Sequence, residues 1–210
     1  DTSLAGIEGL VSQYLTMPDK RIFWSAILGL LGAPVSVFGH FGIYTLIKPY
    51  SRQYAKLFGV GTLGLFALGG AGVHMSSLAS AFFYKYITAA DPENALAASI
   101  TFVCSFSLPL YIAFFVFWLI HTYAHIRAIA GAFSPYPRWC WMFSMPVGAL
   151  LFSLVNVFGN YAIVNAIMVG ALTLGNIWAL GGSLLMLDKA KENHEKNPLL
   201  NFSNGKRIKP

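Results

Sequence analysis

Charged residues are scarce in this sequence, and the few present are unevenly placed. Asp, Glu, Lys and Arg make up only 10% of the 210 residues, whereas soluble domains carry about a quarter. The stretch from Ile22 to Leu187 holds six Lys or Arg and two acids. Its apolar runs exceed the ~18 residues that indicate a transmembrane helix. These features exclude a soluble globular domain, and the sequence also lacks the short alternating segments typical of a transmembrane β-barrel.

Cysteine and membrane-embedded acids are also lacking. The two cysteines, Cys104 and Cys140, are expected near opposite membrane faces, which excludes a disulfide framework. No Asp or Glu lies deep in any expected span, so a carboxylate-rich metal site or an acid pair within the membrane is excluded on this chain. The net charge of +6 comes from basic residues whose positions along the chain indicate membrane orientation. We therefore expect no nucleic-acid partner.

What the sequence does contain is a series of apolar segments separated by turns and short charged loops. We therefore expect an all-α fold, a polytopic bundle of five transmembrane helices. The expected spans are 22–47, 57–84, 109–131, 139–157 and 161–187. Pro109 is expected to separate the third span from residues 95–107, which would form a half-helix or a re-entrant segment.

The two ends of the chain differ from this bundle. Residues 1–21 are expected to form an amphipathic helix at the membrane interface, followed by a turn. Residues 188–210 are expected to be a polar, partly disordered tail. With this tail in the cytoplasm, eleven Lys or Arg fall on the cytoplasmic side and three outside, as the positive-inside rule requires. An outer first residue implies one further helix upstream of Asp1.

Four of the five histidines lie within the expected spans. His40 is in the first span, His74 in the second, and His121 and His125 in the third. Placing an ionisable residue inside a membrane costs free energy, so such residues are the first candidates for a functional site. Because His121 and His125 are four residues apart, they share one helix face and suit a single metal ion. We expect His74, His121 and His125 to bind zinc, with His40 as a fourth ligand or a proton shuttle.

The histidines leave several functions open. Zinc would supply a hydroxide nucleophile, giving a zinc-dependent hydrolase acting on a lipid-like substrate. Haem b with axial histidines from two helices, in an electron carrier, is an alternative. A third is a non-enzymatic transporter, sensor or accessory subunit of a membrane complex, in which each imidazole only hydrogen-bonds a neighbouring helix. Asn165 and Asn176, three helical turns apart, are expected to share a face, either for helix contacts or for a polar substrate path.

A family resemblance rests on two stretches, "GLLGAPVSVFGHFGIYTLIKP" at 29–49 and "GGAGVHMSS" at 69–77. These resemble a bacterial family of small multi-pass membrane proteins known only as a domain of unknown function. In that family a helix with a Gly-Asp pair precedes this region, in keeping with the missing upstream span. The resemblance implies a bacterial inner membrane, and it implies no activity.

Overall fold

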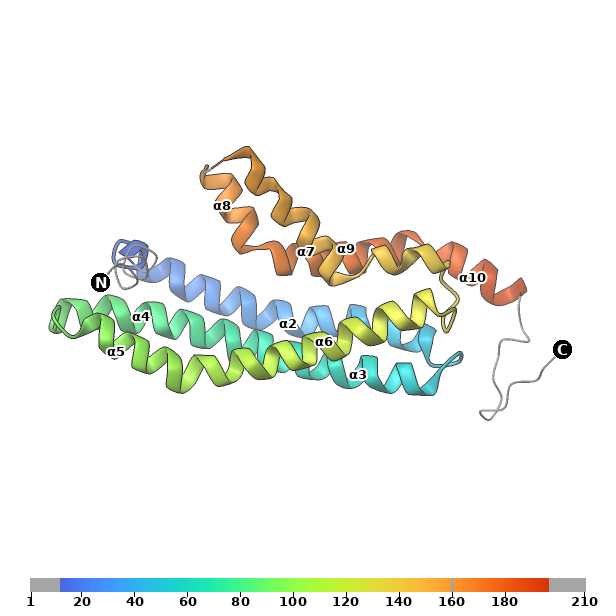
Figure 1. Cartoon of the computed structure of the whole chain (residues 1–210), viewed down its shortest axis with the longest axis horizontal. Helices are drawn as coiled ribbons and strands as arrows, with labels where there is room; N and C mark the ends of the chain where they lie inside the picture. The colour runs from blue at the N-terminus through green and yellow to red at the C-terminus, as the bar shows by residue number, and fades with distance from the viewer. Residues whose placement is uncertain (1–11, 160, 197–210) are drawn as a thin grey trace. The chain divides into compact units, whose positions relative to one another are not determined.

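The first long helix covers the residues of the first expected span. The computed structural model describes residues 12–159 and 161–196, and these are helices joined by short turns, with no strand among them (Figure 1). Helix α2 (Asp19–Ile47) is apolar enough to cross a membrane and keeps Pro34 within it. Most of the interfacial helix expected within residues 1–21 lies outside the described residues; Ser12–Tyr14 forms a single 3-10 turn.

The second long helix covers the residues of the second expected span and contains an unusual central stretch. It runs without a break over 39 residues as α3 (Arg52–Phe66), a π-helical segment (Ala67–His74) and α4 (Met75–Ala90). π-helical turns are uncommon and often lie at functional sites. Five of the eight residues in this one are Gly or Ala, so little side-chain bulk resists the wider turn.

The third long helix corrects the expected break at Pro109. Residues 95–130 form one continuous helix: α5 (Ala95–Phe102), a π-helical segment (Val103–Ser107) and α6 (Leu108–Ala130). Pro109 is the second residue of α6, and the N–H of Leu108 bonds the carbonyl of Val103 across the π turn. The ring therefore lies just after a widened turn, where its missing N–H and its bulk disturb the helix least. The half-helix or re-entrant segment expected over 95–107 is wrong.

The C-terminal part differs most from the five-span expectation. A 3-10 turn (Arg138–Met142) precedes α7 (Met145–Ser153), which continues as a 3-10 turn (Leu154–Phe158). After it come α8 (Ala162–Val169), α9 (Ala171–Leu185) and α10 (Leu187–Lys196). The Met145–Phe158 segment is too short to cross as a simple span, and α8 meets α9 at 70°. Among the described residues, three helices can cross a membrane, or four if α8 and α9 form one bent span.

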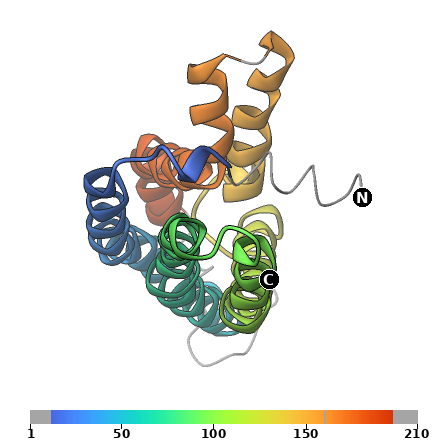
Figure 2. The ribbon, with the colours of Figure 1, turned by 90° about the vertical axis from the view of Figure 1, so that its left-hand side faces the viewer.

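These C-terminal helices fold back on one another. Helix α7 with its 3-10 extension and helix α8 form neighbouring arms of a hairpin (Figures 1 and 2), and α7 packs closely along α9. Residues 188–196, expected within a partly disordered tail, are helical instead. Two contacts hold helix α10 against the rest of its unit. Ala190 is fully buried, and the Tyr50 hydroxyl and His194 Nδ1 form a hydrogen bond of 2.7 Å.

The described residues divide into two compact units, whose boundaries fall within the long helices. The first unit comprises residues 12–35 and 63–117. The second comprises residues 36–62, 118–159 and 161–196. A core in the second unit is built around Phe58 and Ile47, which are both fully buried, with small residues of α6 packed against them. The candidate site lies beside this core.

Candidate functional site

Three of the four histidines predicted as metal ligands meet in the second unit. His40 comes from α2, and His121 and His125 come from α6; all three are fully buried. The ring centroids of His40 and His121 are 4.9 Å apart, and those of His121 and His125 are 6.1 Å apart. The ring of Phe58 from α3 packs against all three, at 4.5 Å from His121 and 5.6 Å from His125. We call these three histidines the imidazole triad.

The first member of the triad is oriented by its own helix. His40 Nδ1 lies 2.9 Å from the carbonyl oxygen of Ser36, one turn earlier in α2. A carbonyl oxygen only accepts hydrogen bonds, so Nδ1 must carry the proton and donate it. In the neutral ring the lone pair then lies on Nε2, because a neutral imidazole has one donor and one acceptor nitrogen.

A second hydrogen-bond chain orients His121 in the same sense. The Thr62 hydroxyl donates to the Phe58 carbonyl at 2.8 Å, which uses its only proton. Thr62 Oγ1 is also 3.1 Å from His121 Nδ1, so the imidazole must be the donor in this contact. The lone pair of neutral His121 therefore also lies on Nε2. Thr62 is 4% exposed, which shields both bonds from competing solvent.

Three other nitrogens of the triad, on His121 and His125, are buried without hydrogen bonds from the described residues. Within residues 12–159 and 161–196, His121 Nε2 and both ring nitrogens of His125 find no hydrogen-bond partner. Each such group costs about 1–3 kcal/mol, and an unsatisfied buried group calls for an explanation such as a bound ion or water. As the rings lie, no three His, Cys, Asp or Glu side chains of the described chain are placed to hold a metal ion.

A glycine lets the two helices that carry these bonds come together. A Cβ atom at Gly61 of α3 would lie 2.6 Å from the backbone nitrogen of His121 and 2.7 Å from its Cα. Only glycine fits there, because these are backbone atoms that no side-chain rotation can move. This close approach brings Thr62, the next residue, within reach of the His121 ring. Gly61, Thr62 and Phe58 were not predicted as site residues.

His74, the other predicted ligand, belongs to the first unit. It is the last residue of the π-helical segment, and its Nε2 donates to the carbonyl oxygen of Ser25 in α2 at 2.9 Å. Its ring lies over Gly29, where an added Cβ would be 2.1 Å from Nε2. This contact is an interhelical hydrogen bond of the kind that the alternative interpretation expected.

The two predicted asparagines do not share a helix face. Asn165 is exposed on α8, whereas Asn176 lies in α9 beyond the 70° bend and is 8% exposed. Gly170, between the two helices, ends the straight helix that the expectation assumed. Asn176 donates to the Ser36 hydroxyl at 3.0 Å. Because the Ser36 carbonyl holds His40, Asn176 joins the polar network of the triad.

Together these residues form a polar network buried in apolar surroundings. It links α9, α2, α3 and α6 through hydrogen bonds and ring contacts. Residues 36–62 and 118–185 contain no Asp or Glu, so the network has no carboxylate to balance a bound cation or to act as a base. Its chemistry is that of neutral imidazole, hydroxyl and amide groups, which suit a transition-metal ion or a shared proton.

Comparison with known proteins places the chain in a family without adding an activity. No curated protein and no solved structure matches it. One family model, described as a family of unknown function (DUF6796), matches residues 2–190, which is most of the chain. The protein is therefore a member of the family of unknown function DUF6796.

Proposed function

We propose that the protein is an integral membrane protein whose imidazole triad binds one divalent transition-metal ion, with zinc as the expected ion. The observation that carries this proposal is the anchoring of two Nδ1–H groups, of His40 on Ser36 and of His121 on Thr62. Metal-binding histidines usually donate their other N–H to a protein acceptor, which fixes the ring and raises its basicity. Anchoring of this kind places both lone pairs on Nε2, the nitrogen through which each ring would bind a cation.

The spacing of the rings supports this choice of ligands. Two imidazoles bound to one tetrahedral ion at ~2 Å have ring centroids ~5 Å apart, close to the 4.9 Å between His40 and His121. The 6.1 Å between His121 and His125 is wider. Binding would therefore require the His125 ring to turn and the Phe58 ring to give way. The ion would satisfy the buried nitrogens of His121 and His125.

The same geometry disfavours haem b. An axial pair of histidines holds its rings on opposite faces of a flat macrocycle. His40 and His121 instead meet edge to face, and Phe58 packs against both. A macrocycle would have to separate rings that are in contact, whereas a single ion needs only a small rotation. We therefore retain zinc and set haem aside.

Hydrolysis of a lipid-like substrate is the reaction that we propose for such a centre. Zinc held by three imidazoles lowers the pKa of a bound water to near neutrality and so supplies a hydroxide. Substrates that reach a site buried among apolar helices are themselves largely apolar. The chain provides no nearby carboxylate base, so proton transfer would depend on the imidazoles and on their partners Thr62 and Ser36.

We further propose a multi-pass protein of the bacterial inner membrane, with its C-terminal end in the cytoplasm. The turn after α2 and the start of α3 carry Lys48, Arg52 and Lys56, and Arg127 and Arg138 follow the triad in α6 and beyond it. Three crossings would place these five cations on one side. If α7 to α9 enter and leave the membrane on that same side, α10 also lies there. Association with other membrane subunits is compatible with this arrangement.

Metal content of the purified full chain tests the proposal. We expect about one zinc ion per chain for the wild type, prepared in mild detergent without chelator, and almost none for His121→Ala, because three imidazoles are needed for tight binding. His74→Ala serves as the matched control, since it also removes a histidine from an apolar helix but is expected to keep the metal. Mass-spectrometric metal analysis gives the readout.

A gentler variant separates metal binding from misfolding. Thr62→Val keeps the shape of the side chain but removes the acceptor that orients His121. Loss of such an outer partner typically weakens metal affinity about 10–100-fold, so zinc titration of the apo-protein should show a weaker Kd at an unchanged thermal midpoint. Equal zinc content in the wild type and a folded His121→Ala would refute the proposal, as would a wild type that takes up no zinc on titration.

A further inference from the structure

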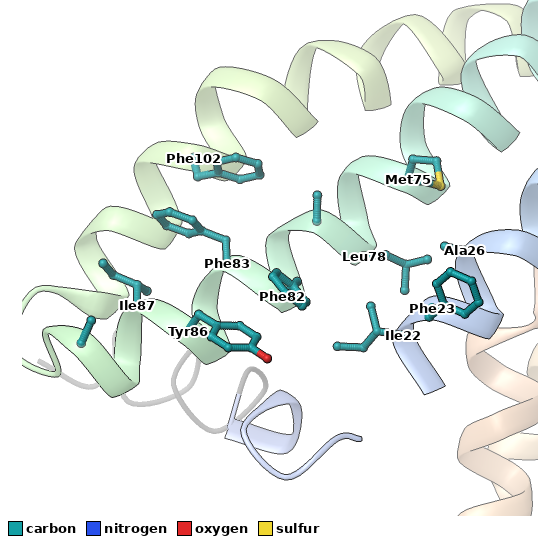
Figure 3. A pocket seen from close by; sticks show the side chains of 12 residues that line it. Ile22, Phe23, Ala26, Met75, Leu78, Phe82, Phe83, Tyr86, Ile87 and Phe102 are labelled. Atoms are coloured by element: carbon teal, nitrogen blue, oxygen red, sulfur yellow. The ribbon is translucent and has the colours of Figure 1, made fainter. Parts of the chain in front are cut away.

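The first unit carries an apolar groove that is separate from the imidazole triad. It has a volume of about 620 Å³ and is lined by residues of α2, α4 and α5 (Figure 3). This volume falls within the ~300–1,000 Å³ range of small-molecule sites. Phe23 and Ala26 line it from α2, Leu78 and Phe82 from α4, and Phe102 from α5. Apart from the Tyr86 hydroxyl, its lining side chains are apolar.

The shape of the groove matches one extended acyl chain. Its lining residues recur along α4 from Met75 to Ala90, a distance of ~22 Å at the helical rise of ~1.5 Å per residue. Half of a bilayer's hydrocarbon core is ~15 Å thick. Because α4 belongs to a helix apolar enough to cross a membrane, the groove follows the direction in which lipid tails lie.

One end of the groove is polar and offers free positive charge. Asp19 accepts hydrogen bonds from Lys85 Nζ at 2.7 Å and from the Tyr86 hydroxyl at 2.6 Å. Lys20 and Arg21 immediately precede the first lining residue of α2 and are exposed, and no ion pair engages either of them within the described residues.

The acids at this end leave these two cations available. The carboxylate of Asp19 is occupied by Lys85 and Tyr86. Asp91, which follows the groove on α4, accepts hydrogen bonds from the backbone and side chain of Asn94. Glu93 is exposed in the turn between α4 and α5. Lys20 and Arg21 can therefore pair with an anion in the head-group layer.

We propose that this groove binds a single glycerophospholipid, with one acyl chain along α4 and the phosphate on Lys20 and Arg21. The tail accounts for the apolar lining and for the length of the groove. The phosphate accounts for two exposed cations placed at the groove's polar end, because basic side chains next to a membrane segment recognise lipid phosphates. This site does not depend on the imidazole triad.

Lipid binding to the delipidated full chain tests this assignment. The probes are dioleoylphosphatidylglycerol and dioleoylglycerol, which share their tails but differ in the phosphate, and native mass spectrometry counts the bound molecules. We expect one phosphatidylglycerol per chain and about tenfold weaker binding of dioleoylglycerol, the loss that one favourable ion pair of ~1.4 kcal/mol represents. Lys20→Gln combined with Arg21→Gln should abolish this difference between the probes.

Two tryptophan variants separate the groove from the general lipid-facing surface. Ala79→Trp places a large ring in the groove and should remove the specific phosphatidylglycerol. Ile112→Trp, at a 58% exposed position of α6 that does not line the groove, should bind like the wild type. If Ala79→Trp does not fold, Ala79→Leu fills part of the same space and replaces it.

Several outcomes would overturn the proposal. Equal lipid binding by the folded Ala79 variant and the wild type would show that the groove is not the site. Equal affinity for the two probes would remove the role of the phosphate. A dimer that forms without lipid and is lost in Ala79→Trp would show that a second copy of the chain covers the groove.

Discussion

Gly61→Ala is expected to lower the thermal midpoint of the protein in detergent by about 5–10 °C, at ~2–4 °C per kcal/mol for a chain of this size. The added Cβ would lie 2.6 Å from the backbone nitrogen of His121, so α3 and α6 must separate. Overpacking of this kind costs ~1–3 kcal/mol. The separation also stretches the bond from His121 to Thr62, and an orphaned buried donor adds ~1–3 kcal/mol. The gain of ~1 kcal/mol in helix propensity offsets only part of this.

Gly59→Ala is the matched control for this substitution. It lies on the same helix, but its added Cβ would be 3.4 Å from the side chain of Tyr44, which is an ordinary contact distance. We expect its thermal midpoint to equal or exceed that of the wild type, since alanine is the better helix former. Both variants are followed by circular dichroism during heating. Equal midpoints for the two variants would mean that α3 and α6 do not approach closely at Gly61.

The second large effect is expected from Gly175→Ala in α9. An added Cβ there would lie 2.5 Å from the carbonyl oxygen of Met145 and 2.8 Å from the backbone nitrogen of Ala149. These atoms belong to the α7 backbone, so the only relief is to move the two helices apart. We expect a loss of about 3 kcal/mol, at the upper end of the usual cost of overpacking. The bond from Trp178 Nε1 to the Met142 carbonyl, 2.8 Å long, should break as α7 moves.

Gly181→Ala tests whether this effect is specific to the contact between α7 and α9. Gly181 lies in the same helix, and nothing within 4 Å would meet its added Cβ. Its thermal midpoint should be unchanged or slightly higher, whereas Gly175→Ala should also expose α7 to faster limited proteolysis. If the two variants melt together and are cut at the same rate, the tight pairing of α7 with α9 is wrong.

The long spans could be predicted from the sequence because hydropathy measures directly what a membrane requires. The expected first span at 22–47 agrees closely with α2 (Asp19–Ile47). Breaks in the helices were harder to predict, since the effect of a proline or glycine depends on the backbone conformation of the residues around it. Pro109 was expected to split a helix but follows a π turn that accommodates it, whereas Gly170 bends the chain inside a run that carries no charged residue.

The site was predictable only in part, for a similar reason. His121 and His125 share a helix face by their spacing alone, and this pairing is confirmed. The approach of His40 depends on how α2 packs against α6, and a single sequence does not show how two helices pack. The roles of Gly61 in the close helix approach and of Thr62 in orienting His121 can be recognised only in the structure, where α3 faces His121. His74 lies at the end of a π-helical segment, where phase arguments based on a regular helix no longer apply.

The π-helical segment Ala67–His74 changes which side chains of the second long helix share a face. An extra residue in one turn adds ~100° of rotation to everything that follows it. The side chains of α4 are therefore out of phase with the regular helical pattern of α3, although the two belong to one continuous helix. A helical wheel drawn across Ala67–His74 would therefore mix two different faces. Deleting a single residue there would restore the regular pitch. It would also turn Ser77 away from the hydroxyl of Tyr111, which it contacts at 2.6 Å.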